Sequence, residues 1–403
     1  MAGEAELGIL PTSRGAILVY RMTVRSPRDI QTYFVNARSG AIERHVTRIR
    51  TDGPISGAGT GVLHDRKKLS VDQASGTYAA IDLFRPTKLY TINFHGSLSR
   101  LNDFLQTGIV FLSDIATASS NVWADGAVVD AHVYQGWVYD YYYKRFGRHG
   151  LDDRNIQVVG LTHPLARADA SSYSPQMIGS FLNNAGYMGD GFIYYGDGDG
   201  RIFDYLAGGL DIVAHELSHG VTAYTSDLDY KDESGALNEA FSDIMGTAVE
   251  FFFEKSGAGP QKGPNFLIGE DVTRIAPGYI RSLQNPITTG YPDHYSLRQF
   301  IGTETDHGGV HVNSTIVSHA FYLAVAGGTN RVSGITVTGV GVANIDRMER
   351  IFYRGFVFML TPKSQFADAR AATLQAATDL YGPNSNERAQ LLEAWTAVGV
   401  GAP

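Results

Sequence analysis

The first fifty residues contain short runs rich in apolar, β-branched and aromatic side chains, which are typical of β-strands. A turn-like segment, Ala37–Gly40, separates two of these runs and predicts a hairpin. A stretch rich in Gly and Pro at residues 51–59 predicts a linker. We therefore expect residues 1–55 to form an N-terminal β extension. The expected strands are Ala16–Val24, Thr32–Asn36 and Ala41–Val46.

Beyond the linker, the pattern changes from strand-like to helical near residue 210. Residues 60–205 are β-rich and interrupted by turns, with one expected helix at Val128–Tyr143 that ends in basic residues suited to a helix C-terminus. After His219, apolar residues recur at helical spacing. Further helices are expected at Ala236–Glu254, Val310–Ala326, Val342–Leu360, Gln365–Tyr381 and Asn386–Ala397.

These elements predict an α+β protein with a β-rich half at 56–209 and an α-helical half at 210–403. The segment around His215 lies where the two halves join. Clefts between such halves are common ligand sites, so the chemistry of this segment matters most.

His215 and His219 lie four residues apart in the motif His-Glu-x-x-His. Residues with this spacing share one face of an α-helix, so both imidazoles can reach a single point. Two neutral imidazoles that meet in this way suit Zn²⁺. Glu216 lies beside them and can act on water held at the metal. A buried histidine pair can also be purely structural, so the motif alone leaves both interpretations open.

Glu239 is the candidate for a third ligand, in a segment that begins a second helical pattern. Two histidines and one glutamate leave the fourth tetrahedral position to water, which is the layout of a catalytic zinc site. Alternatively, Glu239 is a solvated carboxylate near a helix start, where the helix dipole favours it. Its apolar neighbours Ala236, Leu237 and Phe241 favour the buried ligand.

Composition argues against several classes of protein. The 403 residues carry a net charge of −8 and no basic cluster that could neutralise phosphates, so we expect no nucleic-acid partner. The absence of Cys excludes disulfides, thiolate zinc sites and a cysteine nucleophile. No apolar run approaches the roughly 18 residues of a membrane span. The opening residues Met1–Glu6 do not form a signal peptide.

Three segments together resemble the thermolysin family of zinc endopeptidases. They are His215–His219, the Glu239 segment and Gly308–Ser314, which reads Gly-Gly-Val-His-Val-Asn-Ser. The resemblance runs from about Gly57 to the C-terminus. It implies a thermolysin-like two-lobed fold, zinc held by His215, His219 and Glu239, and protein or peptide substrates.

The resemblance also assigns catalytic roles. Glu216 is implied to take a proton from the attacking water and to pass it to the leaving amine. His311 and Tyr230 match the donors to the negatively charged tetrahedral intermediate. Asp306 matches the carboxylate that orients the histidine at 311, and Asp243 matches one that hydrogen-bonds a zinc-bound histidine.

Substrate contacts follow from the same resemblance. Asn184 and Ala185 match an edge strand that pairs with an extended peptide, and Arg281 matches an arginine that binds a substrate carbonyl. Gly186 and Tyr187 replace bulkier aromatics, which predicts a more open non-primed side. The implied S1′ pocket favours cleavage before Leu, Ile, Val or Phe, although each of its residues could instead be a core residue. These residues are Phe203, Leu206, Ile212 and Ile280.

Calcium is the point at which the sequence departs from the family pattern. Asp211, Glu250 and Glu270 match carboxylates of the family's double calcium site. Asn265 and Leu267 replace two further acidic positions, and the loop at residues 255–264 is longer. Because two adjacent divalent cations need many carboxylates, we expect one Ca²⁺ at most.

The N-terminal β extension resembles the end of the family's propeptide, although it could also be a plain extension of the enzyme. The resemblance implies secretion, and we expect a monomer. Besides an active enzyme, two alternatives remain open: a latent zymogen in which the N-terminal segment is a partner of the catalytic part, and a catalytically inactive relative that binds peptides.

Overall fold

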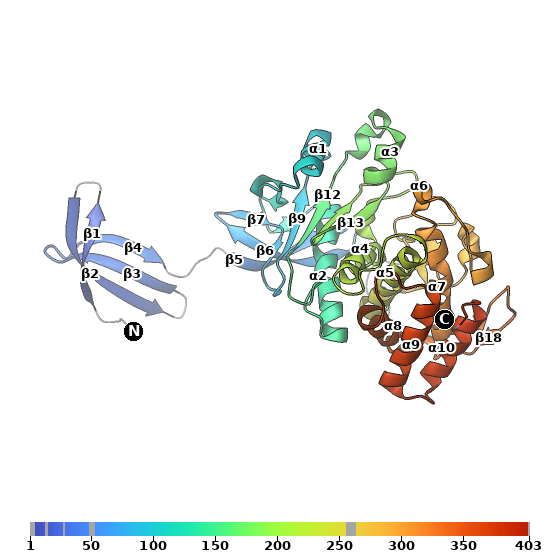
Figure 1. Cartoon of the computed structure of the whole chain (residues 1–403). Coiled ribbons are helices and arrows are strands. Elements are labelled where there is room, and N and C mark those ends of the chain that lie inside the picture. Colours follow the sequence, from blue (N-terminus) through green and yellow to red (C-terminus); the bar gives the residue numbers. More distant parts are fainter. Residues whose placement is uncertain (1–4, 13–14, 27–28, 48–52, 255–262, 402–403) are drawn as a thin grey trace. The chain divides into compact units, whose positions relative to one another are not determined.

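The computed structural model describes residues 5–12, 15–26, 29–47, 53–254 and 263–401 (Figure 1). The backbone divides into two compact units. Unit 1 comprises residues 1–53 with 73–75, and unit 2 comprises residues 54–72 with 76–403.

Unit 1 is an antiparallel sheet of four strands in the order β1-β2-β3-β4. The three predicted strands are confirmed, and the sequence analysis missed the first strand. Leu10, Val19 and Thr32 are buried, whereas most other described side chains of this unit are partly or fully exposed. The strands are β1 (Glu6–Thr12), β2 (Gly15–Ser26), β3 (Asp29–Asn36) and β4 (Ile42–Thr47).

The β-rich half of unit 2 contains two five-stranded sheets. The first has the order β10-β7-β6-β5-β11 and the second β13-β14-β12-β9-β8, so β13 lies at an edge of the second sheet. The strands are β5 (Gly53–Thr60), β6 (Arg66–Ala74), β7 (Thr77–Ala79), β8 (Ile81–Asp82), β9 (Leu89–Asn93), β10 (Thr117–Ala118), β11 (Val122–Trp123), β12 (Val158–Thr162), β13 (Ala185–Gly189) and β14 (Phe192–Tyr195).

The prediction of a single helix in this half was wrong. Besides α2 (Gly126–Phe146), which contains the predicted segment, the half holds α1 (Leu98–Thr107) and the short α3 (Pro175–Met177). Ser97 caps α1 by accepting a hydrogen bond from the Arg100 N–H. Leu98, Leu101, Phe104 and Leu105 recur at helical spacing in α1, but the helix has only 10 residues, so the sequence offers a short pattern that was overlooked.

The helical half agrees with the sequence pattern closely. α5 (Asp232–Phe253), α7 (Val310–Ala326), α8 (Ile345–Phe358), α9 (Phe366–Tyr381) and α10 (Asn386–Ala397) are the five predicted helices. Helix α4 (Leu210–Ala223) carries the His-Glu-x-x-His motif, and the one-turn helix α6 (Thr303–Asp306) was not predicted. Two small two-stranded sheets complete this half: β15 (Leu267–Ile268) with β16 (Arg281–Ser282), and β17 (Gly328–Thr329) with β18 (Thr336–Val337).

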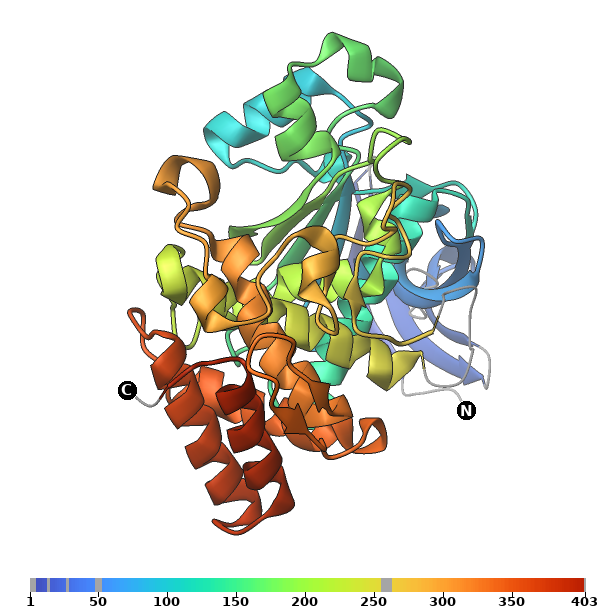
Figure 2. The same ribbon diagram turned by 90° about the vertical axis from the view of Figure 1, so that its right-hand side faces the viewer.

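Helices α4 and α5 lie at the centre of unit 2, between the strands and the helices α7–α10 (Figure 1), and the C-terminal helices α9 and α10 pack side by side (Figure 2). Gly246 on α5 permits the close approach of α5 to α4, because a Cβ there would lie 2.8 Å from the carbonyl oxygen of Asp211. One apolar core spans α2, α4, α5 and α7–α10. The two central helices are therefore held rigidly on both sides.

Within the described residues, no helix combines the length and hydropathy that a bilayer-crossing segment needs.

Candidate active site

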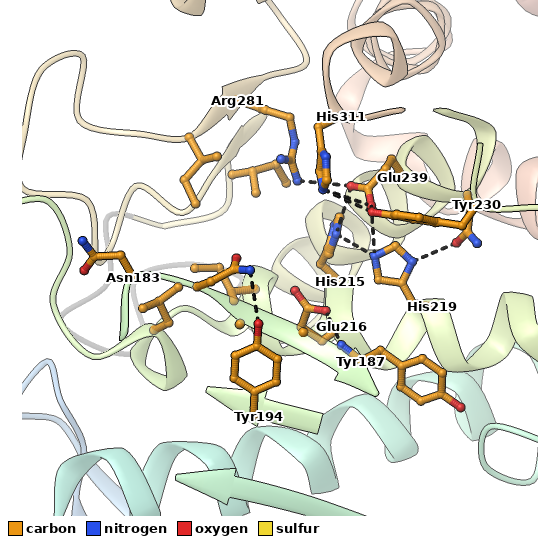
Figure 3. A pocket seen from close by; sticks show the side chains of 18 of the residues that line it. Asn183, Tyr187, Tyr194, His215, Glu216, His219, Tyr230, Glu239, Arg281 and His311 are labelled. Carbon is orange, nitrogen blue, oxygen red and sulfur yellow. Dashed lines mark hydrogen bonds and ion pairs between the residues drawn. The ribbon is translucent and has the colours of Figure 1, made fainter. Parts of the chain in front are cut away.

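The central feature of unit 2 is a meeting point of three side chains from α4 and α5. His215 Nε2 lies 3.0 Å from His219 Nε2, and the two nitrogens lie 3.4 Å from Glu239 Oε2 and Oε1 respectively (Figure 3). Glu239 is completely buried, and its Oε2 has no hydrogen-bond partner among the described residues. A buried carboxylate oxygen in this state needs a counter-charge.

The separations of these donor atoms fit a tetrahedral zinc ion. With ligand bonds of 2.0–2.1 Å, two ligand atoms of a tetrahedron lie roughly 3.3 Å apart, which is close to the 3.0–3.4 Å found here. Two imidazole nitrogens and a carboxylate oxygen are also the donor set that suits Zn²⁺. His215, His219 and Glu239 could therefore hold a zinc ion.

Hydrogen-bond partners on the far side of both rings point their Nε2 atoms at this meeting point. His215 Nδ1 lies 2.9 Å from Asp243 Oδ1, and His219 Nδ1–H donates to Asn238 Oδ1 at 2.8 Å. Each contact places a ring proton on Nδ1 and directs Nε2 at the meeting point, where a bound metal would displace any proton held on Nε2. The sequence analysis named Asp243 but missed Asn238, whose only signal is its place beside Glu239.

Charge in this region is balanced between carboxylates and cationic groups. Arg281 is buried and donates from Nε and Nη2 to Asp243 at 2.8 and 2.7 Å. Burial lowers the pKa of His215, but its contacts with Asp243 and Glu239 outweigh burial and raise the pKa to about 10. Burial raises the pKa of Glu239, but the nearby histidines at 311, 219 and 215 hold it well below its usual value. Glu239 therefore stays ionised, as a metal ligand must.

Glu216 faces the same space from the neighbouring position on α4. Its Oε2 accepts a hydrogen bond from the Tyr187 N–H of β13 at 2.9 Å (Figure 3). This contact holds the carboxylate at the open edge of the second sheet. The Tyr187 N–H was not recognised in the sequence, because strand pairing and side-chain contacts across a cleft leave no local pattern.

His311 and Tyr230 lie together on the opposite side of the cleft. The Tyr230 hydroxyl lies 3.2 Å from His311 Nε2 and also donates to Glu239 Oε1. His311 Nδ1–H donates to Asp306 Oδ1 at 2.5 Å. Burial lowers the pKa of His311, but the charge of Glu239 and the bond to Asp306 outweigh burial and raise it. These two contacts therefore favour the charged form of the His311 ring.

These groups line one cleft of about 590 Å³. The cleft also contains every residue predicted to contact substrate, namely Asn184, Ala185, Phe203, Leu206, Ile212, Ile280 and Arg281. Tyr194 and His307, which the sequence analysis did not single out, line it as well. The missing side chain at Gly186 does not by itself open the cleft as predicted, because the ring of Tyr194 fills the space that a Cβ would enter.

A second group of acidic side chains includes residues from the start of α4 and from the end of α5. Carboxylate oxygens of Asp211, Glu250 and Glu270 lie within 4.8 Å of one another, and Glu250 forms a second such triad with Glu254 and Asp271. The first triad contains the three predicted calcium ligands. Glu254 and Asp271 were not predicted, and residues 255–262 of the longer loop lie outside the described part of the chain.

The electrostatics of this acidic cluster favour a bound cation. Burial and the charge of Glu270 raise the pKa of Asp211 well above its usual value. Burial and neighbouring carboxylates likewise raise the pKa of Glu250 strongly and that of Glu254 to about 8. Asn265 donates to Glu270 Oε1 at 2.5 Å. Oxygen donors of this kind suit Ca²⁺.

Comparisons with known proteins agree with this arrangement. Residues 56–223 match the family model "Thermolysin metallopeptidase, catalytic domain", and residues 226–400 match "Thermolysin metallopeptidase, alpha-helical domain". The thermostable neutral protease NprT of Geobacillus stearothermophilus is 39% identical over 414 residues, which cover 98% of this chain and 69% of that protein. Thermolysin of Alicyclobacillus acidocaldarius subsp. acidocaldarius is 39% identical over 358 residues, covering 85% of this chain.

The aligned region spans only 57% of the length of that thermolysin. Among solved structures, the precursor of protealysin, a metalloproteinase from Serratia proteamaculans, superposes with a TM-score of 0.59 at 25% identity. The superposition covers 78% of this chain and 87% of the precursor.

Proposed function

Because the chain belongs to the thermolysin family of metalloendopeptidases, we propose that it hydrolyses internal peptide bonds with a zinc ion held by His215, His219 and Glu239. The observation that carries this proposal is the convergence of two Nε2 atoms and a buried carboxylate within 3.4 Å, with Glu216 beside them. When bound, zinc supplies Lewis acidity, which polarises the peptide carbonyl and acidifies water.

Glu216 is proposed as the general base. It accepts a proton from the attacking water and then donates that proton to the leaving amine nitrogen as the C–N bond breaks. The hydrogen bond from the Tyr187 N–H restrains this carboxylate against the substrate-binding strand. The Glu216 carboxylate can therefore act first on the attacking water and then on the departing amine.

His311 and Tyr230 are proposed to stabilise the negative charge that develops on the carbonyl oxygen. They are donors on one side of the cleft, and the raised pKa of His311 supplies a positive charge there. Asp306 orients the His311 ring through Nδ1. Donors that are held in place before reaction lower the reorganisation needed in the transition state.

An extended peptide is proposed to pair with the free edge of β13. Asn184 O accepts from the Gly196 N–H on the β14 side, and backbone direction alternates along a strand. Ala185 and Tyr187 therefore direct their backbone groups to the open edge, which agrees with the Tyr187 N–H reaching Glu216. Arg281 uses two of its five N–H groups on Asp243, which leaves donors for a substrate carbonyl.

Phe203, Leu206, Ile212 and Ile280 are proposed to form the S1′ pocket. All four line the cleft, and their apolar side chains favour a bulky apolar residue after the scissile bond.

Unit 1 is proposed to be the remnant of a propeptide that keeps the enzyme latent until it is removed. The two family models begin after unit 1, yet the alignment with NprT covers 98% of the chain and so includes most of unit 1. A solved relative is itself a precursor. Secretion is proposed on the family resemblance alone.

The role of Glu216 can be tested with Glu216→Gln. We expect kcat on casein or a short peptide to fall by roughly 10²–10⁴-fold, because a general base is lost, while elemental analysis still finds zinc. Glu393→Gln, which changes an exposed carboxylate on α10, should match the wild type. Persistent hydrolysis by Glu216→Gln contradicts the mechanism, and an inactive zinc-loaded wild type supports a peptide-binding relative instead.

The pocket assignment can be tested by profiling a peptide library. We expect at least roughly tenfold preference for Leu, Ile, Val or Phe at P1′ over charged residues. Ile280→Ala should shift the preference towards Phe because it enlarges the pocket. Ile287→Ala, at a 44% exposed isoleucine, should leave the profile unchanged. A preference for charged P1′ residues rules the pocket out.

The calcium proposal assigns one Ca²⁺ to Asp211, Glu250 and Glu270. Chelation should lower the thermal midpoint, because buried carboxylates then repel one another, and added calcium should restore it. Glu250→Gln should remove the calcium response and raise the midpoint in chelator above that of the wild type. Calorimetric titration measures how many calcium ions bind, and one is expected. Two bound ions would mean that the second triad, Glu250, Glu254 and Asp271, also binds calcium. No bound ion refutes the assignment.

Processing of unit 1 can be followed by intact-mass analysis of the zinc-loaded chain. We expect the mass to fall by that of the residues before the linker, as peptidase activity rises. The Glu216→Gln protein should keep its full mass when incubated alone. A wild-type chain that is fully active while its mass stays constant shows that unit 1 is no inhibitory propeptide.

A further inference from the structure

Tyr194 is a buried tyrosine whose hydroxyl lies at the wall of the cleft. It belongs to β14 and stands opposite Gly186 of β13. Its side chain is buried, yet it is part of the cleft lining near Asn184. In Figure 3 its ring points up from the strand towards the cleft, and a dashed hydrogen bond ends on its hydroxyl.

The hydrogen bonds of this hydroxyl have a defined direction. The Tyr194 O–H donates to the carbonyl oxygen of Ser180 at 2.7 Å, and Asn184 Nδ2 donates to the Tyr194 oxygen at 3.2 Å. A hydroxyl has one proton, so Tyr194 can only accept from its second partner. Asn184 must therefore turn its NH₂ group towards Tyr194, which turns its Oδ1 away.

Gly186 makes this placement of the ring possible. A Cβ at position 186 would lie 2.6 Å from Tyr194 Cε1 and 3.1 Å from the hydroxyl oxygen. Any side chain at that position would push the ring away from Asn184. Gly186 and Tyr194 therefore act as a cross-strand pair.

The neighbouring Asn183 makes different contacts. Its Nδ2 donates to Asp199 Oδ2 at 3.1 Å, and its Oδ1 accepts from the Asp199 N–H at 2.7 Å. Both ends of its amide are thus occupied by the loop after β14. Asn184 is exposed, and the amide that it presents to the cleft is oriented by Tyr194.

We propose that Tyr194 is a positioning residue for peptide recognition, because it locks the Asn184 amide with Oδ1 directed to accept a backbone N–H of the bound peptide. This inference rests on the proposed peptidase function. An unrestrained exposed amide would rotate between presenting NH₂ and presenting oxygen. Restraining it before binding reduces the conformational entropy lost when the peptide binds.

Tyr194→Phe tests the inference because it removes one oxygen and keeps the ring. We expect kcat/KM on a short peptide to fall roughly three- to tenfold, mainly through KM, since one oriented hydrogen bond is affected. In an Asn184→Ala background, Tyr194→Phe should have almost no further effect. The matched control is Tyr139→Phe, which removes a tyrosine–asparagine hydrogen bond of 2.9 Å outside the cleft and should leave both parameters unchanged.

Thermal midpoints of all variants distinguish a loss of positioning from a loss of fold. The inference is wrong if Tyr194→Phe keeps the wild-type KM. It is also wrong if the effects of Tyr194→Phe and Asn184→Ala are additive. The same cycle can be measured without turnover, as the affinity of the Glu216→Gln protein for a fluorescent peptide. An inactive wild type therefore refutes the proposed function alone, whereas additive affinities refute the positioning role.

Discussion

The site depends on the contact between helices α4 and α5. His215 and His219 share one face of α4, and Glu239 meets them from α5 only because the two helices approach closely at Gly246. A ligand-to-ligand separation of 3.0–3.4 Å leaves little tolerance for a shift of either helix. The apolar core on both sides of this helix pair is therefore what holds the candidate metal site in place.

Burying so many carboxylates beside this contact is unfavourable unless each has a counter-charge or a donor. Asp243 is matched by Arg281 and His215, and Glu239 by the three histidines around it. Asp211 and Glu250, at the far end of the same helices, have raised pKa values; Asp211 accepts hydrogen bonds from the N–H groups of Ile212 and Gly269, whereas Glu250 Oε2 has no hydrogen-bond partner among the described residues. The two acidic groups thus have different chemistry, since the first offers nitrogen and oxygen donors to a metal and the described residues of the second offer oxygen donors.

Much of this molecule was predictable from local patterns. Helix periodicity predicted α5, α7, α8, α9 and α10, and the His-Glu-x-x-His spacing identified His215 and His219, two of the three side chains that meet between α4 and α5. Both signals are local because helix contacts repeat every three to four residues. Strand β1 was missed because only Leu10 of its residues is buried, and helix α1 was missed because its apolar pattern, although helical, extends over only 10 residues.

Sequence by itself determined that His215 and His219 could reach one point and which long segments were helical, because both depend on residues close together in the chain. Only the tertiary structure decided what surrounds them: Asn238 behind His219, the Tyr187 N–H on Glu216, the addition of Glu254 and Asp271 to the acidic cluster, and the hydrogen bond from the Asn184 amide to Tyr194. These contacts join separate elements or depend on the direction of one hydrogen bond. Neither leaves a periodic trace in the sequence, since packing brings the partners together only after the chain has folded.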